Sequence, residues 1–301
     1  MTTECTQVGF EFHSLRSREI RAQFDCGAIP SDAGGLLLRE VEKRTGILRQ
    51  FAACFTDYRK ADLIDHTVEE LVAQRVYGLA LGYEDLNDHE ELRNDPLLAV
   101  LVDKPDLGKA PLAGKSTLNR LELTRETASQ KERYKKIALD HGAVDRLLVD
   151  VFLQAHQEAP KEIILDLDAT DDPLHGKQEG YFFHGYYGHY YYLPLYIFCG
   201  EFLLGARLRT SNIDASAGSV GELKRLSLIH ISRSFTPQTM GDPPSRQGSI
   251  SVCCWLVILK GLMRSAGLLG GQRTRSGCGG FWESGSMSKH RIIRRSRGRD
   301  G

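Results

Sequence analysis

The stretch EIILDLDATDD, residues 162–172, constrains this chain more than any other, because an apolar run turns abruptly into a cluster of aspartates. The run Ile163, Ile164 and Leu165 is typical of a buried strand. Four of the seven positions from 166 to 172 are aspartate. Active sites of open α/β sheets lie at the carboxyl ends of strands, so the stretch indicates either a solvated acidic strand end or a site for chemistry.

Asp166 and Asp168 are the candidate site residues. On a strand, two side chains that are two positions apart face the same way, while Leu167 faces the other way. Two like charges on one face repel each other unless a cation neutralises them or one carboxyl group takes a proton. The pair therefore fits a phosphatase with an aspartate nucleophile or a nuclease-like enzyme whose aspartates hold metal ions.

The phosphatase alternative depends on one short motif. Asp166, Asp168 and Thr170 match the DxDxT signature of haloacid-dehalogenase-like phosphatases, in which the first aspartate attacks phosphorus and the second is the acid/base. Such enzymes carry the motif near the start of the chain and follow it with a helix. Here a long segment precedes it, and Asp171, Asp172 and Pro173 follow it.

The pattern of apolar residues predicts a helical first part and a strand-rich second part. Thr67 and Glu70 form a predicted capping box at the start of a helix within 65–83. Further helices are predicted over 33–48, 87–102, 116–138 and 142–156, and another begins within 216–226. Strands are predicted at Lys161–Asp168, Tyr190–Phe198 and Phe202–Arg209, and the last two form a hairpin at Cys199-Gly200.

The chain of 301 residues, 41% of them hydrophobic, is long enough for a full core. The predicted class is α+β or α/β, with a mostly helical region at 1–157, a partial catalytic core of strand, hairpin and helix at 158–226, and a tail at 227–301. Residues 1–225 hold 27 basic and 36 acidic residues, whereas 226–301 hold 12 and 3, so net charges of −9 and +9 cancel. A basic tail can contact nucleic acid phosphates.

The tail is open to two interpretations. Gly, Ser and Arg make up 34 of its 76 residues, a composition that offsets little of the entropy of ordering and so predicts disorder. It is either a flexible basic tail or a segment read in a shifted frame, which would make the chain a truncated product.

The apolar runs do not indicate a membrane or secreted protein, and the cysteines do not indicate a zinc-binding or disulfide-rich one. No apolar stretch reaches the roughly 18–20 residues of a membrane span, and the first residues do not resemble a signal peptide, so we expect a cytoplasmic protein without a membrane partner. The seven cysteines include no CxxC pair, which argues against a zinc ribbon or a disulfide framework.

Two other motifs suggest sites. GKST at 114–117 resembles the end of a phosphate-binding loop, but its spacing to Gly108 is wrong, and we expect a loop followed by a helix capped by Ser116. The block YFFHGYYGHYYYLPLY contains His184 and His189 without a Cys or carboxylate at ligand spacing. We expect a structural role for it, with stacking on nucleic acid bases as the alternative.

Several separate blocks resemble bacterial insertion-sequence transposases of the DDE type. They run from FDCGAIPSDAGGLLLREVEKRTGIL through ADLIDHTVEELVAQRVYGLALGYEDLNDHEELRNDPLL and ILDLDATDDPLHGKQEGYFFHGYYGHYYYLPLYIF to LLGARLRTSNIDAS. The resemblance extends from about residue 8 to 225 and stops where the composition changes.

The resemblance implies a ribonuclease-H-like mixed sheet preceded by a helical domain. It implies that Asp168 is the first metal-binding aspartate, with Asp166 as second choice, and that Mg²⁺ or Mn²⁺ is the cofactor. Two such ions would activate a hydroxyl group and stabilise the leaving oxygen during attack on phosphorus. The implied partner is double-stranded DNA, as terminal inverted repeats and as target, bound by a possible homodimer in the bacterial nucleoid.

This chain departs from the pattern after residue 226. The resemblance requires a second aspartate on a later strand and a glutamate on a later helix. Asp242 precedes two prolines, and Glu283 has no convincing helix around it. We therefore expect an inactive fragment of a DNA transposase, and a non-catalytic DNA-binding remnant is a further alternative.

Overall fold

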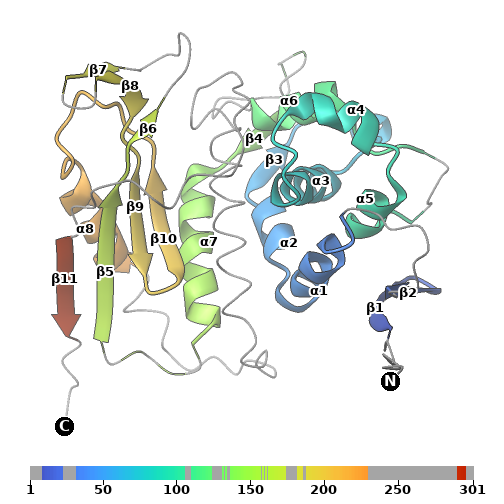
Figure 1. The fold of residues 1–301 in the computed structure, drawn as a ribbon, viewed down its shortest axis with the longest axis horizontal. Helices are drawn as coiled ribbons and strands as arrows, with labels where there is room; N and C mark the ends of the chain where they lie inside the picture. Colours follow the sequence, from blue (N-terminus) through green and yellow to red (C-terminus); the bar gives the residue numbers. More distant parts are fainter. Residues whose placement is uncertain are drawn as a thin grey trace, which may run out of the picture. The chain divides into compact units, whose positions relative to one another are not determined.

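The computed structural model describes residues 9–22, 32–105, 110–123, 131, 133, 136–156, 158, 160, 162–173, 182–185, 188–229 and 290–295. The chain divides into two compact units, 1–139 and 140–301, which are described separately. Figure 1 shows their elements. The helix predicted at 142–156 belongs to the second unit and packs against a strand of that unit.

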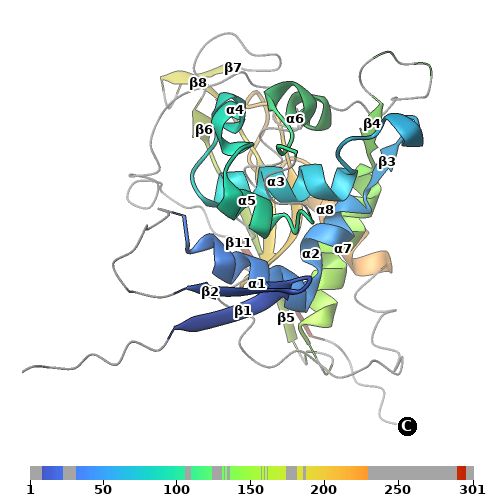
Figure 2. The ribbon, with the colours of Figure 1, turned by 90° about the vertical axis from the view of Figure 1, so that its right-hand side faces the viewer.

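The first unit is mostly helical. It contains the paired strands β1 (Phe10–Leu15) and β2 (Arg18–Ala22), the paired strands β3 (Phe55–Asp57) and β4 (Ile137–Leu139), the helices α1 (Gly35–Thr45), α2 (Ile47–Ala52), α3 (Val68–Ala80), α4 (His89–Leu92), α5 (Pro96–Leu101) and α6 (Lys115–Glu122), and the 3-10 turns η1 (Ala61–Leu63) and η2 (Leu86–Asp88). Helix α3 packs against α1, α2, α5 and α6, as Figure 2 shows.

Helix α3 lies at the centre of this unit, since every residue from Leu71 to Gly78 is buried. Leu71, Val72 and Val76 are fully buried, and each such side chain stabilises the fold by about 1.5–3 kcal/mol. The predicted cap is present, since the Thr67 hydroxyl accepts a hydrogen bond from the Glu70 N–H at 3.1 Å. The Glu70 carboxylate bonds instead to His66 and Lys104.

Three predicted helices of this region are shorter than expected. The helix predicted over 33–48 is broken at Gly46, whose φ of 64° is a conformation that glycine adopts without strain. The one predicted over 87–102 stops before Pro96, which starts α5 with Asp95 as its cap. The one predicted over 116–138 ends at Glu122, and residues 137–139 form β4 because they pair with β3.

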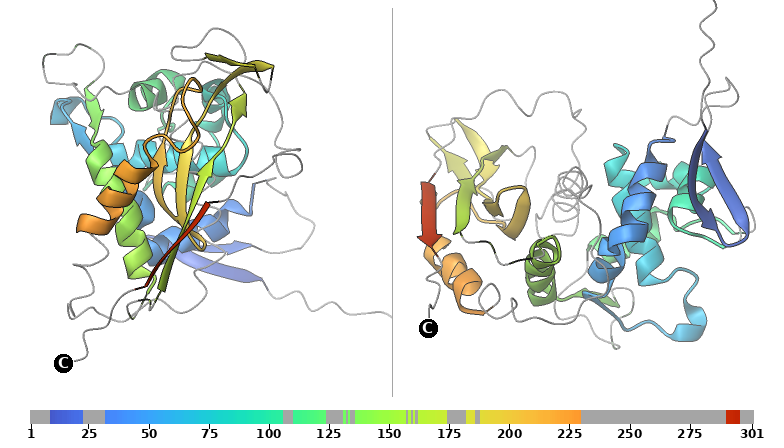
Figure 3. Two further views of the ribbon diagram at one scale, coloured as in Figure 1. Left: turned by 90° about the vertical axis from the view of Figure 1, so that its left-hand side faces the viewer. Right: turned by 90° about the horizontal axis from the view of Figure 1, so that it is seen from below.

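The second unit is built on a four-stranded sheet in the order β10-β9-β5-β11. The strands are β5 (Glu162–Ala169), β9 (Leu195–Cys199), β10 (Phe202–Arg207) and β11 (His290–Arg295). A smaller sheet contains β6 (Asp172–Pro173), β8 (His189–Tyr192) and β7 (Phe182–His184). The helices α7 (His141–Gln154) and α8 (Ser219–Ile229) lie on the same side of the main sheet, as the left view of Figure 3 shows.

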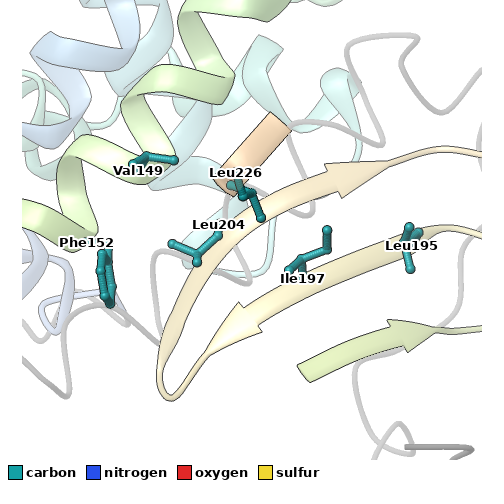
Figure 4. Packing of buried hydrophobic residues seen from close by; sticks show 6 residues of the cluster. All are labelled: Val149, Phe152, Leu195, Ile197, Leu204 and Leu226. Carbon is teal, nitrogen blue, oxygen red and sulfur yellow. The ribbon is translucent and has the colours of Figure 1, made fainter. Parts of the chain in front are cut away.

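The core of the unit lies between these helices and the sheet. Its fully or almost fully buried members are Val149, Phe152, Leu195, Ile197, Leu204 and Leu226 (Figure 4). They come from α7, β9, β10 and α8, so the cluster joins both helices to the middle of the sheet. Leu165 and Leu167 of β5 pack against it.

The structure supports the α+β class and corrects three finer predictions. Every strand pair of the described main sheet is antiparallel, so it is not mixed. The strand predicted at Tyr190–Phe198 is two strands separated by Leu193 and Pro194, because proline has no N–H for a ladder. Residues 290–295 of the tail, where no regular element was predicted, form β11 and pair with β5.

Candidate functional site

The predicted site residues lie on β5, and the register places both on one face. Asp166 is opposite Phe198 of β9, and Asp168 is opposite Tyr196. Leu167 is opposite Ile197 on the other face, which packs against the helices. The predicted alternation along this strand is therefore confirmed. Asp166 is exposed, whereas Asp168 is half-buried near the carboxyl end of the strand.

The four aspartates of the opening stretch do not form one cluster. The backbone leaves the main sheet after Ala169, and the Thr170 N–H donates to the Pro194 carbonyl oxygen at 3.1 Å. Asp172 then enters the smaller sheet, where it is opposite Tyr192. Among the residues that the structure describes, no three His, Cys, Asp or Glu side chains are grouped so that they could hold a metal ion.

Cys199 lies at the end of β9, close to the exposed aspartate. Burial raises the pKa of its thiol, a backbone hydrogen bond with Ile164 lowers it, and the negative charge of Asp166 raises it further, with a net increase. The thiol is therefore protonated at neutral pH. Because the thiolate is the reactive form of cysteine, the raised pKa makes Cys199 a weaker nucleophile than an ordinary cysteine.

Arg209 fixes the loop that follows β10, a role that the sequence reasoning missed. Its Nε donates to the Leu193 carbonyl oxygen at 2.8 Å, and its Nη1 donates to those of Ala215 and Ala217 at 3.1 and 2.5 Å. The Leu193 N–H in turn donates to the Arg209 carbonyl oxygen at 2.9 Å. Arg209 thus ties the loop to the segment beside Thr170. The only feature of the sequence that pointed to this role was a basic residue at the end of a predicted strand.

A group of four charged side chains joins the sheet to its helices. The Arg207 guanidinium donates to both oxygens of Asp145 at 2.7 and 2.5 Å, and to Glu222 at 2.8 Å. Burial lowers the pKa of Arg207, but Asp145 and Glu222 raise it more, so the net shift is upward. Arg225 donates to Glu222 at 2.8 Å and to the Leu204 carbonyl oxygen at 3.3 Å. These four residues belong to α7, β10 and α8.

The comparison with known protein families decides which family this fold belongs to. The sequence matches transposase DDE domain group 1 over residues 12–240, which is most of the chain. The chain belongs to this transposase family. Searches among curated proteins and among solved structures gave no match. The matched region starts within β1 and ends beyond α8, so the transposase domain includes elements of both units.

The family match agrees with the predicted resemblance and extends past residue 225, where the resemblance was expected to stop. Asp242 and Glu283, the two later carboxylates that we considered, lie outside the described residues. In the described parts of this transposase-family chain, no helix is both long enough and apolar enough to cross a bilayer.

The aromatic block of the transposase domain forms β7 and β8. His184 and His189 are opposite each other in the register of these strands. The rings of Phe183 and Tyr190, whose residues are 57% and 45% exposed, meet edge to face with centroids 5.4 Å apart. Such cross-strand aromatic contact stabilises a two-stranded ribbon. It fits the predicted structural role, and base stacking stays an untested alternative.

The GKST motif of the domain is a loop followed by a helix, as predicted. Helix α6 starts at Lys115 with Gly114 as its cap residue, so the expected cap by Ser116 was wrong. The Lys115 N–H donates to the Glu90 carboxylate at 3.0 Å. A carboxylate of the same chain thus takes the position that an anion such as phosphate would need.

Proposed function

We propose that this chain acts on double-stranded DNA in the transposition of an insertion sequence, with Asp168 in the position of the first metal-binding carboxylate. The family match is the observation that carries the proposal. The position of Asp168 supports it, because this half-buried residue lies near the carboxyl end of β5, opposite Tyr196 of β9.

The order of elements supports a ribonuclease-H-like core. The strand with the aspartates, β5, is followed by the hairpin of β9 and β10 and then by α8. This is the order that the resemblance implies for the start of such a core. The other neighbour of β5 in the sheet is β11. Its sequence, HRIIRR, contains no carboxylate that could join Asp168 as a metal ligand.

A divalent metal ion is implied by the family, but the described donor groups do not fit it. Mg²⁺ prefers carboxylate oxygens, and β5 offers Asp168 with Asp166 on the same face. A third ligand is missing from the described part of the chain. We infer that this polypeptide binds DNA ends or target DNA without cutting them, as an inactive form of a transposase.

The structure around the DxDxT motif argues against the phosphatase alternative. A DxDxT phosphatase needs a helix soon after the motif, whereas here Thr170 is followed by β6. Asp166, which would be the nucleophile, is exposed and lies between Phe198 and Arg291 in the register. Hydrolysis of p-nitrophenyl phosphate by the purified chain, abolished in Asp166→Asn, is the result that would restore it.

The test uses the purified full chain with supercoiled plasmid DNA in Mg²⁺ and then in Mn²⁺. We expect retention of the plasmid in a gel-shift assay and no nicking above that of the Asp168→Asn variant. Nicking that disappears in Asp168→Asn would show that the chain is an active enzyme. Failure to retain DNA would contradict the transposition role itself. Light scattering with and without DNA tests the proposed homodimer.

A further inference from the structure

The hairpin of β1 and β2 is a two-stranded ribbon at the start of the transposase domain. Phe10 pairs with Ala22, and Leu15 pairs with Arg18, so Arg16 and Ser17 form its tip. Figure 2 shows the ribbon beside α1, with which β1 is in contact. Neither the family match nor the predicted site on β5 assigns a role to it.

The half of β1 that leads into the tip is held by a buried guanidinium. Arg39 of α1 is only 1% exposed, and its Nη1 donates to the His13 carbonyl oxygen at 2.6 Å. The same side chain donates to Asp103 at 2.9 and 2.6 Å. The His13 N–H donates to Glu40 at 2.7 Å, and Leu15 is buried. The strand therefore has a fixed position relative to α1.

The tip itself carries two arginines that form no ion pair with a described acidic side chain, although Glu19 follows Arg18 in the sequence. Arg16 and Arg18 are exposed, and neither forms an ion pair with any residue that the structure describes. Arg21 differs, because it lies within 3.4 and 3.0 Å of Glu11 and Glu19. The positive charge of Arg21 is thus neutralised by two glutamates of the ribbon. The charges of Arg16 and Arg18 at the tip are not neutralised by any described acidic side chain.

Arg16 also adopts a strained backbone conformation. Its φ of 55° lies in the left-handed region, which glycine enters easily and other residues enter at a cost. A two-residue hairpin turn requires a positive φ and usually has glycine, asparagine or aspartate there, so the turn explains the conformation but not the choice of arginine. The side chain of Arg16 is exposed and packs into no core, so packing does not explain why this residue occupies the tip.

We propose that the tip of the β1–β2 ribbon binds the phosphate backbone of double-stranded DNA through Arg16 and Arg18. A two-stranded ribbon is narrow enough to enter the major groove, and arginine forms paired hydrogen bonds with phosphate oxygens. Residues 1–225 carry a net charge of −9, so any attraction of DNA to this part of the chain, apart from the basic tail, needs a local positive group. The inference rests on the proposed function, since it takes DNA as the partner.

The test measures binding of the full chain to a short fluorescent DNA duplex by anisotropy, in a salt series between about 50 and 200 mM. For Arg16→Gln/Arg18→Gln, we expect the slope of log affinity against log salt to fall by about one for each arginine lost. Affinity at low salt should fall several-fold. An unchanged slope would overturn the proposal.

Two further variants separate binding from folding and from net charge. Arg16→Gly should keep or raise the thermal unfolding midpoint, because glycine relieves the strain, and yet bind DNA more weakly. Arg44→Gln/Lys60→Gln removes two exposed charges elsewhere in the first unit and should keep the slope of the unchanged chain. An equal loss in this control would show a general charge effect and overturn the proposal.

The result also distinguishes this inference from the proposed function. If the unchanged chain does not bind duplex DNA, both are wrong. If the unchanged chain binds duplex DNA and the Arg16→Gln/Arg18→Gln variant binds it equally well with the same salt slope, only the role of the ribbon is wrong.

Discussion

Arg207 of β10 and Asp145 of α7 form a bidentate ion pair, with two N–H to carboxylate contacts of 2.7 and 2.5 Å. The same guanidinium contacts Glu222 of α8, so one side chain connects the edge strand of the described sheet to two helices. Paired hydrogen bonds between charged groups are stronger than neutral ones and restrict geometry. Together with the buried apolar cluster, this ion pair holds α7 and α8 against the sheet that carries Asp168.

We expect Asp145→Asn to lower the free energy of unfolding of the second unit by about 1–3 kcal/mol, because the charged hydrogen bonds of Arg207 are lost. Hydrogen exchange of peptides from α7 and β10 measures this effect. Asp150→Asn, an exposed change on the same helix, is the control and should be close to neutral. Equal exchange rates in the two variants would show that the pair contributes nothing.

A larger effect is expected in the first unit at the ion pair of Arg75 and Glu122. Their side chains are only 1% and 7% exposed, and Arg75 also donates to the carbonyl oxygens of Tyr83 and Glu84 at 3.0 and 2.7 Å. Glu122→Gln leaves a buried guanidinium without its counter-charge and should cost about 3–5 kcal/mol. Urea unfolding followed by circular dichroism measures the loss.

Replacement of both partners, by Arg75→Met with Glu122→Leu, is the matched variant for that pair. It removes the two charges together, so it should be less destabilising than Glu122→Gln alone. A double variant that is less stable than the single one would show that Arg75 acts mainly through its contacts with the loop at 83–84.

The stability of the first unit should depend on pH through His89. This residue is fully buried, and its Nδ1 lies 3.2 Å from the Gln74 amide nitrogen. Burial, and to a lesser extent the charge of Arg75, lower its pKa from 6.5 to about 4. The unfolded chain takes up this proton below about pH 6.5, but the folded chain does so only near pH 4.

The free energy of unfolding is therefore unaffected by protonation of His89 above about pH 6.5. It falls progressively as the pH is lowered towards 4, by an amount on the order of 3 kcal/mol, because the unfolded chain binds the proton more tightly. The urea midpoint between pH 7 and 4, followed by hydrogen exchange of α3 and α4, measures it. His89→Gln should flatten this dependence. An unchanged slope in the variant would mean that another group is responsible.

The core under the site can be tested at Leu204. This side chain is fully buried between β9, α7 and α8. Leu204→Ala should destabilise the second unit by about 2–5 kcal/mol, because the lost contacts leave a cavity. Val220→Ala on α8, a position that is 65% exposed, is the control and should have little effect. Thermal unfolding and exchange of β10 peptides report both.

The periodicity of apolar residues in the sequence was enough to predict the strand β5 and the helices α3 and α7. In β5, the apolar residues alternate with Asp166 and Asp168, and this local pattern already fixes which side chains share a face. Thr67 predicts the start of α3 for a similarly local reason, because a cap hydroxyl bonds an N–H only three residues away. The resemblance to DDE transposases, which the family match confirms, also needed the sequence alone.

Tertiary contacts decided the rest. Pro194 interrupts the strand for a local reason, but the partners of Leu193 and Pro194 at the break are Arg209 and Thr170, which are distant in the chain. The pairing of β5 with β11 joins segments more than 100 residues apart, beyond the reach of any local pattern. The four aspartates looked like one site in the sequence. In the structure, Asp168 lies in the main sheet and Asp172 lies in the smaller one. The reason is that pairing of the backbone with distant strands determines where each residue lies, and the sequence does not show this pairing.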